Sequence, residues 1–372
     1  MSSSQSIHFN RNESKVFHTE LRKRVDQYFK DKNVDVHATM TMHFKTVLIA
    51  VSFFGSWGLI ISDILPLWLF YIVAAFNGFT SALIGLNIAH DAIHGAYSKN
   101  HTVNKALGHF MCLIGANDYM WSIKHNKVHH TFTNIPGVDD DLNQPSILRI
   151  APDQPLKFYH RYQTFYMFLL YPLASFSWIF VRDFKNLSRV TTDFREKNPP
   201  STTEYIRFFG FKALYFSVFL ILPFFVLHYA WYHILAGFMT ARLVEGFVLA
   251  MIFQLAHLVE DVEFPEPDAA GNMEHNWAIH QLCTTANFAC KNPMVNFLYG
   301  GLNFQIEHHL FPNICHIHYA NLSYIVRDTA KEFQLPYNEY GTMASAVGAH
   351  IRMMDRFSRG DEFKPSTKMA TI

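Results

Sequence analysis

The sequence predicts an all-α integral membrane protein with four transmembrane helices in two hairpins and a cytosolic helical cap. Half of the 372 residues are hydrophobic and only 16% are charged, whereas a soluble domain usually carries about 25% charged residues. Four long segments are almost free of charge, and Lys and Arg lie mainly outside the tips that would join them. This composition, with a net charge of +1, excludes a disordered chain and argues against a nucleic-acid-binding protein.

The first predicted hairpin lies near the N-terminus. No residue between Lys45 and Asp63 is charged, and Ile64–Ala89 contains neither an acid nor a base. At 1.5 Å per residue the second segment would be about 39 Å long, which exceeds the roughly 30 Å thickness of the hydrocarbon core. Asp63 and Pro66 therefore mark a tight turn between two membrane spans.

The second predicted hairpin follows later in the chain. Its spans are Tyr205–Leu227 and Ile234–Ala256, with a turn at residues 228–233. The last span contains Arg242 and Glu245, and charges at such depth normally face the bundle interior and pair. Their i,i+3 spacing allows an ion pair within one helix.

One apolar segment has two possible interpretations, as a membrane span or as an interfacial helix. Residues 162–181 are uncharged and long enough to cross, but Pro172 interrupts them and basic residues follow directly. If this segment crossed, histidine-rich stretches on its two sides would lie on opposite faces of the membrane. We therefore expect an interfacial helix, with spanning as the alternative.

The distribution of Lys and Arg predicts the orientation. Both hairpin tips lack these residues, whereas the N-terminus, residues 90–204 and the C-terminal third are rich in them. The positive-inside rule places these three regions, both termini and the active site in the cytoplasm. The polar start, MSSSQSIHFN, has no apolar core of a signal peptide.

We divide the chain into three parts. Residues 1–44 form an N-terminal cytosolic, amphipathic segment, 45–325 form the membrane domain, and 326–372 form a C-terminal cytosolic segment. Apolar residues every fourth position predict a helix in the first part, which either lies on the membrane surface or packs on the protein; they are Phe17, Leu21, Val25 and Phe29.

Histidine-rich stretches are the main sign of chemistry. The chain has 22 His, and four stretches fall on the predicted cytoplasmic side. Three are boxes, HDAIH (90–94), HNKVHH (125–130) and QIEHH (305–309), and the fourth ends the last span. His pairs four apart share one helix face and can chelate a metal. The eight imidazoles are those of His90, His94, His125, His129, His130, His257, His308 and His309.

The number and surroundings of these imidazoles indicate the metal. One mononuclear site uses three or four ligands, so eight are appropriate for two ions. Imidazole suits iron, zinc and copper alike, while a haem would need histidines inside the spans. Neutral nitrogen ligands with few carboxylates beside a bilayer favour iron and O₂ chemistry over hydrolysis.

Other polar residues lie near the boxes in sequence. Asp91 could orient an imidazole, or be a solvated charge. We expect a solvated loop, rather than a docking site for an electron donor or a lipid headgroup, at the acidic run 139–141. For His280, His316 and His318 we expect structural or headgroup-facing roles rather than metal ligation. Trp121 either lines a substrate tunnel or packs in the core. The four scattered Cys have neither disulfide nor zinc-site spacing.

These boxes, in this order, resemble those of the membrane fatty-acid desaturase family. The most specific stretch is NFQIEHHLFP (303–312), and the resemblance covers roughly residues 40–325. The Gln that opens the third box is similar to that of the front-end and acyl-lipid subgroup, which includes linoleoyl-CoA-type enzymes. The resemblance implies four spans and a cytosolic cap that holds two irons, with the eight histidines above as ligands. Gln305 would stand beside them as a ligand or as a nearby partner.

The resemblance also implies the reaction and its partners. Two iron ions and O₂ would introduce a cis double bond into a fatty acyl chain carried on CoA or on a lipid. The chain contains no HPGG haem motif, so we expect a separate electron donor of ferredoxin or cytochrome b5 type with its reductase.

Two other classes of function compete with this one. A lipid hydroxylase on the same scaffold could use the same di-iron site. A metal transporter or zinc-dependent hydrolase would be a different class, but a transporter should place its ligands within the spans. The position of the double bond, the chain length, the acyl carrier, the identity of the donor and the oligomeric state stay open.

Overall fold

The computed structural model describes residues 7–10, 15–142, 146–188 and 200–361. Over these residues the chain is predominantly helical, and its two paired strands, β1 (Asn287–Phe288) and β2 (Glu339–Tyr340), run parallel. The predicted helical class is confirmed. The chain forms two compact units: unit 1 consists of Met1–His37, Lys124–Met167 and Ile252–Ile372, and unit 2 of Ala38–Ile123 and Phe168–Met251.

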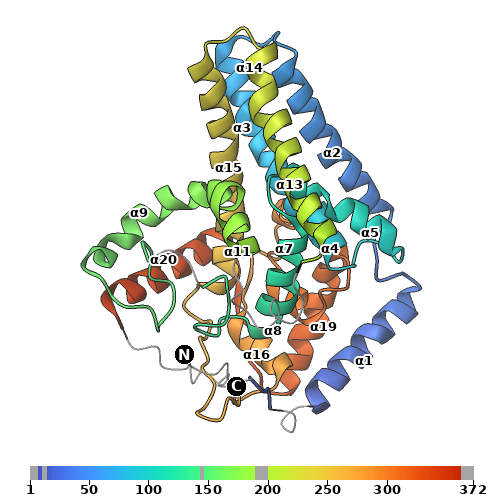
Figure 1. Cartoon of the computed structure of the whole chain (residues 1–372). Helices are drawn as coiled ribbons and strands as arrows, with labels where there is room; N and C mark the ends of the chain where they lie inside the picture. The colour runs from blue at the N-terminus through green and yellow to red at the C-terminus, as the bar shows by residue number, and fades with distance from the viewer. Residues whose placement is uncertain (1–6, 11–14, 143–145, 189–199, 362–372) are drawn as a thin grey trace. The chain divides into compact units, whose positions relative to one another are not determined.

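Long apolar helices make up most of unit 2 (Figure 1). Each predicted span corresponds to one of them within a few residues. They are α2 (Met40–Ile61); α3 (Leu67–Leu83), continued by a π-helical turn, η1 (Ile84–Ala89), and α4 (His90–Ile93); α13 (Thr202–Phe216), continued by η6 (Ser217–Ile221) and α14 (Leu222–Val226); and α15 (Trp231–His257). Each is long and apolar enough to cross a membrane.

A fifth segment, Phe158–Leu187, meets the same criteria of length and composition. It is broken into short pieces around Pro172, which are η3 (Phe158–Tyr162), α9 (Gln163–Leu170), η4 (Tyr171–Leu173), α10 (Ala174–Ser177), η5 (Trp178–Arg182) and α11 (Asp183–Ser188). Proline removes a backbone donor and bends a helix. The described residues therefore hold five candidate spans, against four expected.

The two hairpin tips of unit 2 are tied together. Asp63 has a left-handed φ of 59°, which ends α2 sharply. Its carboxylate accepts the backbone N–H of His228 at 3.0 Å, and the hydroxyl of Tyr229 donates to the carbonyl of Leu65. The two predicted turns therefore lie side by side.

Close helix contact and a buried ion pair hold α15 in unit 2. A Cβ on Gly78 of α3 would lie 2.0 Å from the carbonyl oxygen of Ala241, so only glycine allows this approach. One residue further, Arg242 forms the predicted ion pair with Glu245. The guanidinium also donates to the hydroxyl of Tyr215 at 3.2 Å. Both charges are buried, and their pairing offsets the cost of burial.

The N-terminal amphipathic helix belongs to the core of unit 1. Helix α1 (Lys15–Lys32) packs its apolar stripe against a cluster from α16 (Trp277–Thr284), α18 (Gln305–Leu310) and α19 (Tyr319–Glu332). Phe17 is 1% exposed, and its ring meets that of Phe333 edge-on. Burial of each such side chain is worth about 1.5–3 kcal/mol. Packing on the protein, rather than lying on a membrane surface, is therefore the correct alternative.

The remaining elements are short apart from α20. In unit 2 they are α5 (His101–Gly108), α6 (Phe110–Leu113) and α7 (Asp118–Ser122). In unit 1 they are α8 (His130–Phe132), α17 (Pro293–Leu298), η7 (His316–His318) and α20 (Met343–Arg359), while a second π-helical turn, η2 (Ile123–His129), begins at the boundary of the two units.

Candidate metal centre

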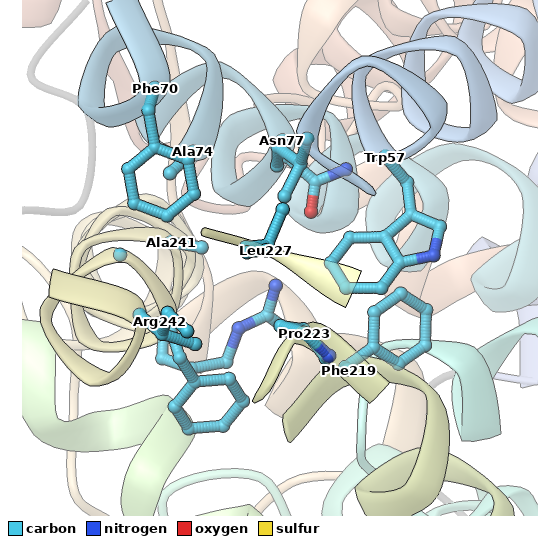
Figure 2. A pocket seen from close by; sticks show the side chains of 13 residues that line it. Trp57, Phe70, Ala74, Asn77, Phe219, Pro223, Leu227, Ala241 and Arg242 are labelled. Atoms are coloured by element: carbon cyan, nitrogen blue, oxygen red, sulfur yellow. The ribbon is translucent and has the colours of Figure 1, made fainter. Parts of the chain in front are cut away.

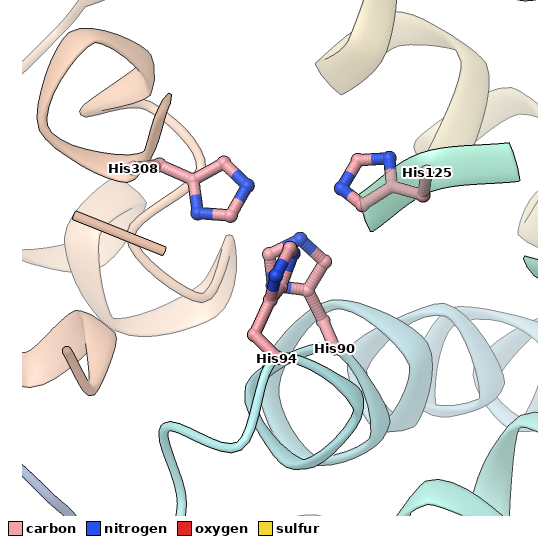
Figure 3. Close-up of side chains that lie close together, drawn as sticks. All are labelled: His90, His94, His125 and His308. Atoms are coloured by element: carbon pink, nitrogen blue, oxygen red, sulfur yellow. The ribbon is translucent and has the colours of Figure 1, made fainter. Parts of the chain in front are cut away.

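The first histidine box follows directly from a membrane helix. The π-helical turn η1 ends at Ala89, and His90 and His94 then project from one face, with ring centroids 4.7 Å apart (Figure 3). The indole of Trp121 lies edge-on to both rings, at 5.4 and 6.0 Å. Trp121 therefore packs on the box-one imidazoles of unit 2.

The second box lies on a π-helix instead of the expected α-helix. In the π-helical turn η2, hydrogen bonds join residues five apart, and such turns are frequent at functional sites. Here the Nε2 atoms of His125 and His130, also five apart, are 3.2 Å from each other. The rings of His125 and His308 stack with centroids 6.0 Å apart (Figure 3).

Within unit 1, three distant parts of the sequence bring imidazoles together. The ring centroids of His129 and His257 are 4.7 Å apart, and that of His309 lies 5.1 and 4.9 Å from them. One nitrogen from each ring lies within 4.8 Å of the other two. A second group with the same property consists of His130, His308 and His309. All these rings are buried.

The outer nitrogen of each ring in the first group faces an acceptor. His129 Nδ1 lies 3.0 Å from Asp139 Oδ2, His309 Nδ1 lies 2.8 Å from an oxygen of Gln281, and His257 Nδ1 lies 3.3 Å from the carbonyl of Thr284. Each ring can then donate its Nδ1–H outward and keep a lone pair on Nε2.

The inner nitrogens of these rings, their Nε2 atoms, indicate a metal site. The Nε2 atoms of His129 and His309 are buried and have no hydrogen-bond partner. A buried polar atom without a partner costs about 1–3 kcal/mol, so a metal ion bound to these nitrogen lone pairs would remove that cost. Neutral imidazoles with their outer nitrogens fixed are the usual arrangement around a metal ion, and the residues present therefore fit a transition metal.

Protonation in this cluster follows burial and neighbouring charge. Burial, reinforced by the adjacent histidines, holds the pKa of His309 well below its usual range, so its ring is neutral. Burial lowers the pKa of His129 as well, but the carboxylates of Asp139 and Asp141 outweigh that effect and raise it. The two carboxylates therefore favour the protonated form of the His129 ring.

The two residues expected beside the ligands are both buried. Asp91 Oδ1 is 3.8 Å from Nδ1 of His90, which is longer than a hydrogen bond. Gln305 begins α18. In the same helix Glu307 accepts from the amide of Asn287 at 2.7 Å and from the hydroxyl of Tyr337 at 2.9 Å, and burial raises its pKa to about 7.

The structure adds residues that the sequence did not reveal. Asp139 was expected in a solvated loop, but it is fully buried and holds His129. Gln281 and Thr284 belong to no motif in the sequence. The one sequence feature that could have indicated their burial is the uncharged stretch around His280. That histidine has the expected structural role, since its Nε2 bonds to the carbonyl of Thr133 at 2.8 Å.

A small, partly open cavity lies among the long helices of unit 2 (Figure 2). Its walls are apolar apart from Asn77 and Arg242. Asn77 precedes His90 on the same continuous helix by about 20 Å, at 1.5 Å per residue. The cavity is therefore separate from the box-one histidines.

Comparison with known proteins extends this picture. A model of the fatty acid desaturase family matches residues 66–341. The chain is 33% identical over 348 residues to the sn-1 linoleoyl-lipid 6-desaturase of Arthrospira platensis, covering 94% of each. It is 34% identical to the enzyme of the same name from Synechocystis sp., with 92% of this chain and 96% of the relative covered. It is 35% identical to the acyl-lipid (8-3)-desaturase of Physcomitrium patens, with 91% and 71% covered.

Fold and site together define a helical integral membrane protein with a buried histidine cluster suited to a transition metal. The chain belongs to the fatty acid desaturase family. It is an oxidoreductase that introduces double bonds into fatty acyl chains. Family membership removes the metal transporter and the zinc-dependent hydrolase from consideration.

Proposed function

We propose that this enzyme forms a cis double bond in acyl chains that are esterified to membrane lipid. The relatives from Arthrospira platensis and Physcomitrium patens are named for acyl groups on lipids. Gln305 opens the third box as in the acyl-lipid subgroup that the sequence resembles. An acyl-CoA carrier is the alternative that the experiment below distinguishes.

We further propose that eight histidines hold two iron ions. Six of them, from box two, box three and the end of α15, lie in unit 1, and the two partnerless Nε2 atoms of His129 and His309 carry this assignment. His90 and His94 are assigned to the same centre from their motif. Gln305 and Asp91 are proposed to act beside the ligands.

Bound iron supplies the oxidising power, with O₂, to remove two hydrogens from neighbouring CH₂ groups. The reaction balances as CH₂–CH₂ plus O₂, two electrons and two protons, giving CH=CH and two waters. We propose that a separate ferredoxin or cytochrome b5 type donor, with its reductase, provides those electrons. The protein's own residues hold and orient the ligands and keep bulk water away, since the rings of unit 1 are buried.

We also propose four membrane crossings, with both termini and the metal centre in the cytoplasm. Three candidate spans separate His129 from His257 in the sequence. Because their ring centroids are 4.7 Å apart, an even number of crossings must lie between them. Phe158–Leu187, which is interrupted at Pro172, is the segment that we assign to the interface.

The function is tested by expression in a host of known lipid profile, with product analysis by mass spectrometry. We expect a new unsaturated species that appears in glycerolipids before it appears in acyl-CoA. His130→Ala should reduce this product to background, because it removes one of the clustered ring nitrogens. His228→Ala, at the hairpin tip, is the matched control and should leave the yield largely unchanged.

Three results would contradict the proposal. A hydroxylated product would mean a hydroxylase on the same scaffold. Early labelling of acyl-CoA would replace the lipid carrier by CoA. Equal loss of activity in His228→Ala and His130→Ala, with both proteins folded, would remove the special role of the histidine cluster.

A further inference from the structure

Two buried polar side chains outside the histidine boxes face the outer nitrogens of two proposed ligands. We propose that Asp139 and Gln281 are positioning residues that fix the ring tautomers of His129 and His309, and so set the affinity for one of the two metal ions. This inference rests on the proposed iron site. It assigns a function to residues that no box contains.

Asp139 is placed to accept three hydrogen bonds at once. Its Oδ2 accepts from His129 Nδ1 and from the backbone N–H of Asn134, both at 3.0 Å, and its Oδ1 accepts from the backbone N–H of Asp141 at 3.0 Å. The side chain is fully buried. A carboxylate can accept from all three donors, whereas an amide has only one oxygen and would leave a donor facing its NH₂ group.

The neighbouring carboxylate of Asp141 does not replace Asp139. Its Oδ2 is 3.6 Å from His129 Nδ1, beyond hydrogen-bond length, and the side chain pairs with Lys124. Asp139 is therefore the group that bonds directly to this ring. A charge-assisted bond of this kind is about twice as strong as a neutral one.

The loop that carries Asp139 also holds a second proposed ligand. Asn134 adopts a left-handed φ of 56°, which turns its side chain toward the end of α15. Its Nδ2 donates to the carbonyl of His257 at 2.9 Å and to that of Glu263 at 3.2 Å. A shift of this loop would therefore move His129 and His257 together.

Gln281 has the corresponding role for box three. Its oxygen faces His309 Nδ1 at 2.8 Å, and its Nε2 donates to the carbonyl of His130 at 3.3 Å. Four residues earlier on α16, Trp277 donates to the same carbonyl at 2.9 Å. Gln281 is fully buried, so the bridge between the second and third boxes is shielded from water.

The loss of such outer partners typically costs a metal site 10–100-fold in affinity. We therefore expect Asp139→Asn to weaken one of two iron sites to that extent, measured by competition with a chelator. Asp140→Asn, a change of the same chemistry on the adjacent, less buried residue, is the matched control and should bind iron as the original protein does. Gln281→Met removes the acceptor of the His309 hydrogen bond with little change in side-chain size. It tests the proposal independently if Asp139→Asn is unstable.

Mössbauer spectra of protein loaded with ⁵⁷Fe separate positioning from general destabilisation. Positioning predicts that Asp139→Asn and Gln281→Met alter the signal of about half of the iron, because the group of His129, His257 and His309 would hold one ion of the proposed pair. Thermal unfolding of the iron-free variants should stay close to that of the iron-free original protein. A structural defect would instead lower that unfolding temperature and disturb both iron signals.

The outcomes distinguish this inference from the function on which it rests. If the original protein takes up two irons and desaturates, while a folded Asp139→Asn or Gln281→Met binds iron normally, the inference is wrong and the function stands. If the original protein binds no iron, the proposed centre itself fails. An equal loss in Asp140→Asn would also overturn the assignment to Asp139.

Discussion

At the scale of single residues, the chemistry depends on which nitrogen of each imidazole a neighbour holds. Asp139, Gln281 and the Thr284 carbonyl each face an outer Nδ1. The Nε2 atoms of His129 and His309 have no hydrogen-bond partner, and their lone pairs can bind a metal ion. An imidazole without such a partner would rotate and exchange tautomers, so these contacts hold the rings in the orientation that the proposed metal site requires.

A buried histidine away from the centre should make stability depend on pH. Burial lowers the pKa of His350 to about 4, and its Nδ1 bonds to the carbonyl of Leu258 at 2.7 Å. Above the unfolded pKa of about 6.5 the ring is neutral in both states and contributes nothing to the difference. Below it the unfolded state binds the proton first, so stability falls as the pH drops toward 4.

The expected loss from His350 is roughly 2 kcal/mol between pH 7.5 and pH 5. The measurement is the free energy of unfolding in detergent at both values. His350→Gln should reduce this pH dependence by that amount, whereas His101→Gln, on an exposed histidine, should leave it unchanged. Identical pH profiles for His350→Gln and the original protein would contradict the assignment.

At the scale of elements, π-helical turns adjust the register of two boxes. The turn η1 ends one residue before His90, and η2 contains His125 and His129. A π-turn inserts an extra residue into the helical repeat. Residues five apart then face each other, which is how His125 and His130 bring their Nε2 atoms to 3.2 Å.

A glycine in α15 determines how closely the interrupted segment packs within unit 2. A Cβ on Gly246 would lie 2.2 Å from the carbonyl oxygen of Pro172. We expect Gly246→Ala to destabilise the protein by about 1–3 kcal/mol, because backbone atoms must move apart. The measurement is thermal unfolding in detergent.

Gly210 in α13 provides the control for this change. A Cβ there meets nothing within 4 Å, and Ala favours a helix over Gly by about 1 kcal/mol. Gly210→Ala should therefore cost no stability. Similar unfolding temperatures for the two variants would show that the Gly246 contact is unimportant.

At the scale of the whole molecule, chain continuity requires an even number of crossings between two residues that lie in one cluster. A segment that leaves one face of a bilayer returns to it only after an even number of crossings. Since His129 and His257 lie in one cluster, at least one of the three apolar segments between them must remain on a single side. We propose that this segment is Phe158–Leu187, which is interrupted at Pro172, and therefore predict the same face for the residues before and after it.

Single cysteines labelled with an impermeant reagent measure this topology. The native Cys112, Cys283 and Cys315 are buried, and Cys290→Ser removes the fourth. Ile147→Cys and Thr202→Cys, both at exposed positions, should react from the same face. His228→Cys, at the hairpin tip, should react from the other face. Labelling of residues 147 and 202 from opposite faces would mean that the segment crosses.

Much of the fold could be predicted because its signals are local. Long uncharged runs specify α2 and α3, and the spacing of Phe17 to Phe29 specifies a helix with one buried face. The ion pair of Arg242 and Glu245 follows from its i,i+3 spacing. Less of the candidate site could be predicted from the sequence, since Asp139 looks like part of an acidic loop and Gln281 belongs to no sequence pattern.

The sequence by itself determined the helical class, the apolar segments and the eight candidate imidazoles, because composition and spacing act over a few residues. Only the tertiary structure decided which nitrogens face inward, that α1 packs in the core of unit 1, and that Asp139 is buried. These depend on tertiary contacts, some of them between residues more than a hundred positions apart, such as Asn134 with His257. No local pattern encodes such contacts, because each one is created when the chain packs.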